Sequence, residues 1–248
     1  YRADSVSNAL ALLEEHGDDA QILAGGQSLM AMMNLRLLAP EALIDINSIE
    51  ELSGISQEDG SIRIGALTRH AEVENSEIVA QHLPLLKMAI GHVGHAAIRN
   101  RGTLGGSISL ADPAAEMPAC AVALDAEFEV QGPGGIRRIA ADNFFHGLFE
   151  TERQADELLT AVHFPLPASE SRSAFNELAR RHGDYALVGV AIHGPVTGGT
   201  LGALRIVYFG VGDKAILATN AAQALEGQSL TDETLTRAQE ALNGDLDP

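Results

Sequence analysis

The stretch Ile98-Arg99-Asn100-Arg101-Gly102-Thr103-Leu104-Gly105-Gly106-Ser107 decides the fold. It places three glycines and two hydroxyl side chains within ten residues, in a chain of formal net charge −18. Glycine tolerates positive φ and lets the backbone approach a ligand closely. Successive N–H groups in such a turn can form a concave anion site. An ordinary surface turn, closed by its own hydroxyl groups, explains this stretch alone equally well.

A second glycine turn lies earlier in the chain, in Ile22-Leu23-Ala24-Gly25-Gly26-Gln27-Ser28-Leu29. A short apolar run, a glycine pair, a serine suited to cap a helix and a helical pattern follow one another there. This order predicts a strand, a loop and a helix. The N-terminus of a helix offers free N–H groups and the positive end of the dipole, which favour phosphate. Two such loops can hold one diphosphate cofactor between them.

Neither loop has the G-x-G-x-x-G pattern of a Rossmann dinucleotide site, and neither is followed by the Gly-Lys-Ser/Thr of a P-loop. A Rossmann site and an NTPase are therefore disfavoured.

Three segments together resemble a known family: AGGQSLMAMMNLRLLAPEALIDI (24–46), IRNRGTLGGSISLADPAAEMPACAVALDA (98–126) and RRHGDYALVGVA (180–191). They are similar to the FAD-binding medium subunits of the molybdenum hydroxylases, which include carbon monoxide dehydrogenase, xanthine dehydrogenase and bacterial hydroxylases of N-heteroaromatic compounds. The resemblance covers essentially the whole chain. Its specific part is AGG-x-S together with T-x-GG at this separation, followed by GDYA.

The resemblance implies an α+β fold, with a two-lobed PCMH-like FAD-binding domain followed by a smaller domain of antiparallel strands and helices. A polar, turn-like stretch at 53–60 and a proline-rich one at 165–173 suggest the limits. We expect an N-terminal α/β lobe at 1–54, a second lobe at 55–167 and a C-terminal domain at 168–248. The chain opens without an initiator Met and stops just after a helical pattern, so we expect residues to be missing at both ends.

Hydrophobic periodicity and capping residues predict the elements. We expect helices over residues 6–16, 29–38, 69–76, 84–92, 113–124, 213–225 and 231–242, the third capped by Thr68 and the fifth by Asp112. We expect strands over residues 21–24, 43–46, 61–65, 127–130, 136–140, 158–164, 174–178, 187–192 and 204–209.

The resemblance also implies the cofactor contacts. The FAD diphosphate is expected on the backbone amides of Gly25, Gly26, Gln27 and Ser28, with Thr103, Gly105, Gly106 and Ser107 along the diphosphate, ribityl chain and flavin. The remaining expected cofactor-binding residues are Ile22, Leu23, Ala24, Leu29, Val93, Ile98, Asn100, Asp112, Glu116 and Tyr185. No catalytic residue is expected.

Three of these residues have competing interpretations. Asp112 is equally suited to be the N-cap of the helix that follows it. Glu116 stands on an otherwise apolar helix, where an unpaired charge is costly. The family places an acidic residue there at the adenosine end of FAD, and the alternative is a favourable interaction with the helix N-terminus. In the carbon monoxide dehydrogenase branch a tyrosine at the place of Tyr185 lies in front of the isoalloxazine ring, and the alternative is a packed tyrosine in a turn.

Other polar residues invite interpretations that we weigh against a structural role. Arg99 and Arg101 either neutralise the diphosphate or form surface ion pairs, and ion pairs are favoured in so acidic a chain. His92 and His95 are three residues apart but have no nearby Cys or carboxylate ligands, so no metal site is expected. Some family members have a lysine at the place of Asn176, which puts a cofactor contact there in doubt.

Composition argues against several kinds of partner and cofactor. The charge of −18 disfavours nucleic acid and anionic membranes as partners. No apolar run reaches about 18 residues, so we expect no transmembrane helix. Cys120 is the single cysteine, which rules out an internal disulfide and an iron–sulfur cluster held by this chain. We expect a cytoplasmic setting.

The resemblance implies a FAD-carrying electron-transfer subunit of a molybdenum hydroxylase. Electrons are expected to reach it from [2Fe–2S] clusters on an iron–sulfur small subunit and to leave to an external acceptor. The molybdenum–pterin cofactor is expected on a large subunit that hydroxylates the substrate, and the complex is expected to be a dimer of heterotrimers. Two alternatives stay open: a stand-alone flavin-dependent oxidase or reductase, and a scaffold subunit without cofactor.

Overall fold

The N-terminal unit is built on two parallel strands that frame the first glycine loop. In the computed structural model, which describes residues 1–247, this unit contains α1 (Val6–His16), β1 (Ala20–Leu23), α2 (Leu29–Asn34) and β2 (Ala42–Asp45). The pairing runs from Ala20 opposite Ala42 to Leu23 opposite Asp45. The predicted strand, loop and helix are confirmed, but α2 ends at Asn34 instead of residue 38. Arg36 adopts a φ of 58°, which is incompatible with continuing the helix.

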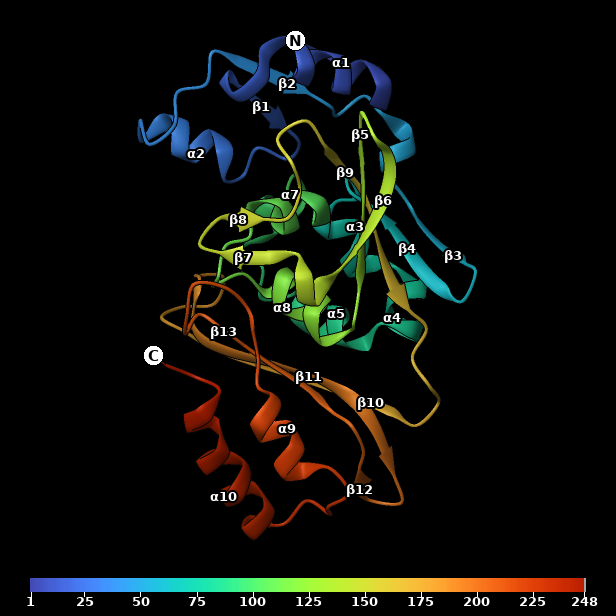
Figure 1. The fold of residues 1–248 in the computed structure, drawn as a ribbon, viewed down its shortest axis with the longest axis vertical. Helices are drawn as coiled ribbons and strands as arrows, with labels where there is room; N and C mark the ends of the chain where they lie inside the picture. Colours follow the sequence, from blue (N-terminus) through green and yellow to red (C-terminus); the bar gives the residue numbers. More distant parts are fainter. Residues whose placement is uncertain (248) are drawn as a thin grey trace.

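A five-stranded antiparallel sheet forms the middle of the molecule (Figure 1). Its strands, in spatial order, are β3 (Ile55–Glu58), β4 (Ser61–Gly65), β9 (Leu158–Pro165), β5 (Glu127–Gly132) and β6 (Gly135–Ala140). β9 occupies the centre although it comes last in the sequence, and its residues 158–164 are all buried. The predicted hairpin of β5 and β6 is confirmed.

Six short helices lie between β4 and β5 in the sequence: α3 (His70–Asn75), α4 (Glu77–His82), α5 (Pro84–Ala89), α6 (Ala96–Arg99), α7 (Leu104–Leu110) and α8 (Glu116–Ala123). The expected cap of α3 is wrong. Thr68 instead exchanges hydrogen bonds with Gly54, whose N–H donates to Thr68 Oγ1 at 3.0 Å. This contact fixes the segment between β4 and α3 against the loop that precedes β3.

Asp112 does not cap a helix at Pro113, contrary to the prediction. Its Oδ1 accepts a hydrogen bond from Ala114 N at 2.9 Å and closes a tight turn. α8 begins three residues later than expected, at Glu116. Glu116 therefore stands in the first turn of α8, and all eight residues of that helix are buried.

The C-terminal part is an antiparallel sheet with helices on both faces. Its elements are β10 (Ser171–Ala179), β11 (Ala186–Thr197), β12 (Thr200–Leu201), β13 (Arg205–Phe209), β14 (Ile216–Leu217), α9 (Thr219–Leu225) and α10 (Asp232–Ala241). α9 and α10 lie on one side of the sheet, and α5 and α8 of the preceding part lie on the other (Figure 1). A small hairpin, β7 (Phe145–Gly147) and β8 (Glu150–Thr151), lies between β6 and β9 of the middle sheet in the sequence.

The predicted α+β class is confirmed. The largest group of buried apolar side chains includes Phe128 and Phe164 of the middle sheet and also Val207 and Phe209 of the C-terminal sheet. A second group fills the N-terminal unit and includes Leu158 from β9. Both groups cross the expected lobe limits, and the limits 1–54, 55–167 and 168–248 stay predictions.

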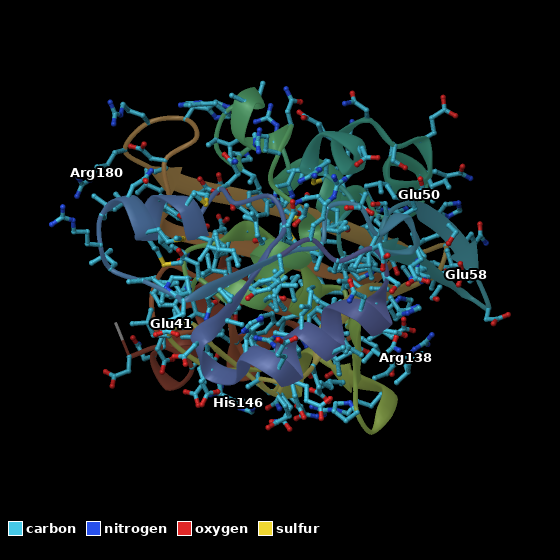
Figure 2. All side chains as sticks on the ribbon, turned by 90° about the horizontal axis from the view of Figure 1, so that it is seen from above. Glu41, Glu50, Glu58, Arg138, His146 and Arg180 are labelled. Atoms are coloured by element: carbon cyan, nitrogen blue, oxygen red, sulfur yellow. The ribbon has the colours of Figure 1, made fainter. Side chains whose placement is uncertain are left out.

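Most charged side chains lie on the surface, and Figure 2 shows labelled examples that project outward around the rim: Glu41, Glu50, Glu58, Arg138, His146 and Arg180. The buried histidine and acidic side chains of the described residues are His70, Glu116, Glu157 and His163. No helix within residues 1–247 is long and apolar enough to cross a membrane.

Candidate flavin site

A cavity of about 640 Å³ is lined by residues from all three parts of the chain. Of the eighteen residues expected to contact the cofactor, sixteen line it and two, Leu23 and Asn100, do not. The side chain of Leu23 packs behind the loop, with Cδ1 3.2 Å from where a Cβ on Gly26 would stand. Asn100 is exposed at the end of α6. The cavity lies within the size range of small-molecule and cofactor sites.

The two glycine loops meet at one wall of this cavity. A Cβ on Gly25 would stand 2.9 Å from the Cα of Gly102 and closer still to the carbonyl oxygen of Arg101. The same carbonyl accepts a hydrogen bond from Arg69 Nη1, and Arg69 Nη2 donates to Asn47 Oδ1 at 2.7 Å. The loops are therefore held together by close backbone contact. Arg69 also links the second loop to Asn47, whose Nδ2 donates to Ala24 O of the first loop at 2.9 Å.

The first loop keeps free N–H donors. Within residues 1–247, the backbone amides of Gly26, Gln27 and Ser28 donate no hydrogen bond. Gly26 adopts a φ of 70°, which a residue with a side chain rarely adopts. Ser28 occupies the N-cap position of α2, but its side chain makes no capping hydrogen bond. These amides can therefore bind an anionic group in the cavity.

The second loop is different, because its amides are already used. Thr103 caps α7 by accepting a hydrogen bond from Gly106 N at 3.1 Å. Gly105 N donates to Ala66 O at 2.9 Å, and Ser107 N donates to Thr103 O at 3.1 Å. Of the two interpretations left open for this stretch, the turn of free amides is wrong, since the residues from Leu104 onward form a helix. The hydroxyl hydrogens of Thr103 and Ser107 can still be donated to a ligand.

Gly105 is required by packing. A Cβ there would stand 2.7 Å from both the Cα and the carbonyl oxygen of Ala66, which follows β4. The glycine thus lets α7 approach the end of the strand directly.

Glu116, Asp112 and Tyr185 share one end of the cavity. Burial is the main cause that raises the pKa of Glu116 to about 8, and the charges of the nearby Glu177 and Asp112 contribute to this rise. The carboxyl group of Glu116 is therefore largely protonated at pH 7. Burial of the phenol raises the pKa of Tyr185, and the carboxylates of Asp112 and Glu116 add to this rise. Tyr185 still exposes 63% of its surface, so it stands at the cavity mouth.

The two arginines of the second loop do not line the cavity. Arg99 Nε lies 2.8 Å from Glu74 Oε2, and Arg99 Nη1 donates to the carbonyl oxygens of Val93 and Gly94. Arg99 therefore supports the cavity wall from behind. Arg101 is exposed to solvent.

His70 and Arg153 are the basic side chains that line the cavity within residues 1–247, and the sequence predicted neither of them as a cofactor contact. His70 is buried at the first position of α3, behind the second loop. Arg153 is the one arginine or lysine within the described residues that lines the cavity. Its Nη1 donates to the carbonyl oxygens of Gln154 and Glu157 at 2.8 and 2.7 Å. Neither residue belongs to a glycine motif, and the local sequence around them carries no signal.

The histidine pair of the sequence lies outside the cavity lining. His92 Nδ1 is 3.9 Å from Glu177 Oε1, and the His95 ring packs near Gly183. Asn176 also lies outside the lining, and its Oδ1 accepts a hydrogen bond from Glu177 N. In residues 1–247 no group of three or more His, Cys, Asp or Glu side chains is arranged to hold a metal ion.

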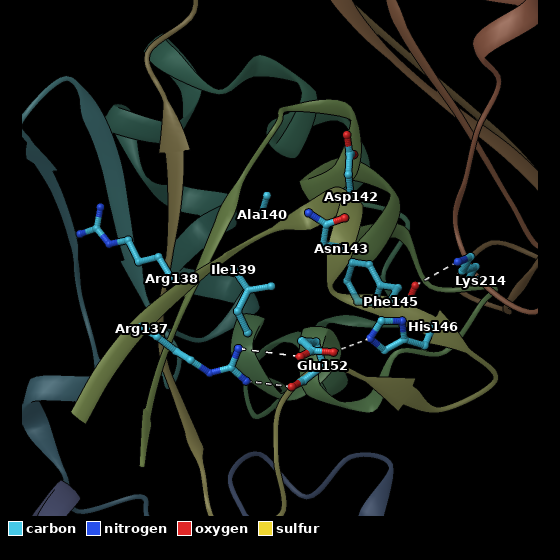
Figure 3. A pocket seen from close by; sticks show the side chains of 10 residues that line it. All are labelled: Arg137, Arg138, Ile139, Ala140, Asp142, Asn143, Phe145, His146, Glu152 and Lys214. Carbon is cyan, nitrogen blue, oxygen red and sulfur yellow. Dashed lines mark hydrogen bonds and ion pairs between the residues drawn. The ribbon is translucent and has the colours of Figure 1, made fainter. Parts of the chain in front are cut away.

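A second hollow, of about 460 Å³, lies beside β6 and the β7–β8 hairpin (Figure 3). Its basic side chains already have partners. Arg137 pairs with Glu157. Figure 3 shows the further contacts: Arg137 pairs with Glu152, His146 Nε2 lies 2.8 Å from Glu152 Oε2, and Lys214 Nζ donates to Phe145 O at 3.1 Å. This hollow is a network of surface ion pairs.

The first cavity fits a FAD molecule. Free amides in the first loop and hydroxyls in the second face it, and the glycines leave space that a Cβ would fill. The protonated carboxyl group of Glu116 and the neutral ring of His70 can each donate a hydrogen bond to an uncharged or anionic part of such a ligand.

Family models match nearly the whole chain. The FAD binding domain in molybdopterin dehydrogenase matches residues 1–167, and the CO dehydrogenase flavoprotein C-terminal domain matches residues 173–248.

Individual relatives agree. The chain is 41% identical over 247 residues to the alpha subunit of the 6-hydroxypseudooxynicotine dehydrogenase complex of Paenarthrobacter nicotinovorans, covering 99% of this chain and 83% of that protein. It is 38% identical to the carbon monoxide dehydrogenase medium chain of Hydrogenophaga pseudoflava, covering 96% of this chain and 83% of that protein.

Solved structures give the same result. The carbon monoxide dehydrogenase structure from Hydrogenophaga pseudoflava matches with a TM-score of 0.97 at 39% identity, over 100% of this chain and 86% of that chain. Quinoline 2-oxidoreductase from Pseudomonas putida 86 matches with a TM-score of 0.94 at 37% identity, over 100% and 86%. The chain therefore belongs to the family of FAD-binding medium subunits of the molybdenum hydroxylases, and it is an oxidoreductase subunit.

Proposed function

We propose that this chain carries electrons between an iron–sulfur partner and an external acceptor by means of FAD bound in the cavity. The observation that carries the proposal is the convergence of both glycine loops on one cavity. Bound FAD can take up electrons one at a time and pass them on, which is chemistry of the cofactor and not of side chains. The chain's own residues bind and orient the cofactor.

The first loop holds the diphosphate through the amides of Gly26, Gln27 and Ser28, and the hydroxyls of Thr103 and Ser107 add contacts on the other side. Tyr185 covers the isoalloxazine ring at the cavity mouth. Glu116 lies near Tyr185, because its carboxylate adds to the rise in the pKa of that phenol. The contact of Glu116 with the adenosine end of FAD stays a prediction.

Residues 1–248 cannot hold an iron–sulfur cluster, because Cys120 is their single cysteine and is buried in α8, so we place the electron source outside these residues. We propose a small subunit with [2Fe–2S] clusters and a large subunit with the molybdenum–pterin cofactor as partners, in a dimer of heterotrimers. We also propose a cytoplasmic setting.

The test begins with co-expression of this chain with candidate small and large subunits and purification of the complex. The complex is then titrated stepwise with dithionite under anaerobic conditions, and its absorbance is recorded at each step. We expect iron–sulfur and flavin bands in one species, with flavin reoxidised when an acceptor is added. A flavin in the isolated chain that is reduced directly by an organic substrate would favour the stand-alone oxidase or reductase. A chain that binds no flavin would favour the scaffold.

A further inference from the structure

His70 is a buried side chain that lines the cavity and has a ring nitrogen without a hydrogen-bond partner in the described part of the chain. Of the four buried histidine and acidic side chains in the described residues, Glu157 is bonded to an arginine and His163 to a glutamate. His70 and Glu116 instead line the cavity. His70 is 4% exposed, and its Nδ1 is buried with no hydrogen-bond partner. The other ring nitrogen, Nε2, has no hydrogen bond to the protein within residues 1–247 either, so a ligand in the cavity can complete the contacts of this ring.

The ring of His70 lies where the two glycine loops meet. A Cβ on Gly102 would stand 2.8 Å from His70 Cδ2 and 3.4 Å from Nε2, so this edge of the ring packs on the Gly102 backbone. Gly25 packs on the same Gly102 Cα. His70 N also donates to Gly102 O at 2.9 Å, which fixes the start of α3 to the loop. The Nε2 edge is therefore aimed at the loop junction.

The ring is neutral and has one proton to donate. Burial, with the positive charge of Arg99, lowers the pKa of His70 to about 4. A buried N–H without an acceptor is rarer than an under-satisfied lone pair. The proton is therefore expected on Nε2, and Nδ1 keeps its lone pair.

We propose that the imidazole N–H of His70 donates a hydrogen bond to a phosphate oxygen of FAD at the junction of the two loops. The inference rests on the proposed function, because it takes FAD as the occupant of the cavity. It also accounts for a difference between the two loops. The first loop supplies free amides, whereas the amides of Gly105, Gly106 and Ser107 are already hydrogen-bonded. A side-chain donor behind the second loop supplies what those amides cannot.

The test compares FAD, ADP and riboflavin as probes of the full chain stripped of flavin, by titration calorimetry. His70→Leu removes the donor at nearly constant volume, and His70→Gln restores an N–H near the position of Nε2. His193→Leu is the matched control, because His193 pairs with Ser173 on the C-terminal sheet and does not line the cavity. Circular dichroism and thermal melting verify that each variant is folded.

We expect His70→Leu to weaken FAD and ADP binding about tenfold, as for loss of a hydrogen bond to a charged group. His70→Gln should recover most of that loss, and riboflavin binding should be unchanged in every variant. Equal ADP affinity in the wild type and in folded His70→Leu would overturn the inference while leaving the flavin site intact. A wild-type chain that binds neither FAD nor ADP would instead overturn the proposed function.

A second readout needs no stability comparison. In ¹⁵N-labelled protein, the ring N–H signal of His70, assigned by its loss in His70→Gln, should shift and exchange more slowly with solvent when ADP is added. A signal unchanged at saturating ADP would contradict the contact.

Discussion

The backbone of Gly25 packs directly on the backbone of Arg101 and Gly102, so that a Cβ at position 25 would stand 2.9 Å from the Gly102 Cα. Seventy-six residues of sequence separate Gly25 from Arg101, yet their contact forms the wall of the cavity. The glycine at position 25 is thus needed for the approach of one loop to the other.

Gly25→Ala should therefore separate the loops. We expect the affinity for FAD to fall at least about tenfold, with a loss of about 1 to 3 kcal/mol in the free energy of unfolding from overpacking. Flavin binding and urea unfolding of the variant measure both effects. Gly134→Ala is the control, because a Cβ at Gly134 meets nothing within 4 Å. Unchanged FAD affinity in Gly25→Ala would show that the loops need not touch.

Gly105→Ala should act on folding. Its Cβ would press on Ala66, so we expect a loss of about 1 to 3 kcal/mol in the unfolding free energy of the flavin-free chain. Gly91→Ala, where the space is open, should change stability little. A Gly105→Ala chain that is as stable as the wild type but does not bind FAD would mean that Gly105 is needed for binding and not for folding.

Glu116 should make stability depend on pH. Its folded pKa of about 8 lies above the ordinary value of 4.5, so the folded state holds the proton more tightly. Its contribution is fully present below about pH 4.5 and is lost as the pH rises towards 8, on the order of 5 kcal/mol in all.

Glu116→Gln should remove this loss, so that the flavin-free variant melts higher than the wild type at pH 8 and similarly at pH 5. Glu226→Gln, at the exposed end of α9, is the control. The prediction fails if the wild type and Glu116→Gln lose the same amount of stability between pH 5 and pH 8.

Tyr185→Ala should open the cavity mouth. We expect iodide to quench the bound flavin's fluorescence more strongly, because the phenol no longer shields the ring. Tyr1→Ala is the control, because Tyr1 is matched in exposure, at 63% for both residues, and does not line the cavity. Identical quenching in the wild type and both variants would place Tyr185 away from the ring.

The sequence predicted the strand, loop and helix of the N-terminal unit because a glycine pair next to a short apolar run is a strong local signal. It did not predict α7, since Gly105, Gly106 and Ser107 have low helix propensity and are helical through Thr103 capping and contact with Ala66. Asp112 satisfied the pattern of an N-cap but closes a turn instead.

His70 and Arg153 could not be found from the sequence for a related reason. Each is brought to the cavity by tertiary packing, His70 by the contact of α3 with the second loop and Arg153 by the turn before β9. The two- and three-residue strands β7 and β8 are too short to give a periodic pattern.

The most direct test of the account is the absorbance spectrum of the purified chain, recorded before and after acid precipitation. The account predicts flavin bands that move to the supernatant and match FAD, as for a noncovalent flavoprotein. A colourless chain that does not take up added FAD, or a flavin that stays with the precipitated protein, would contradict it.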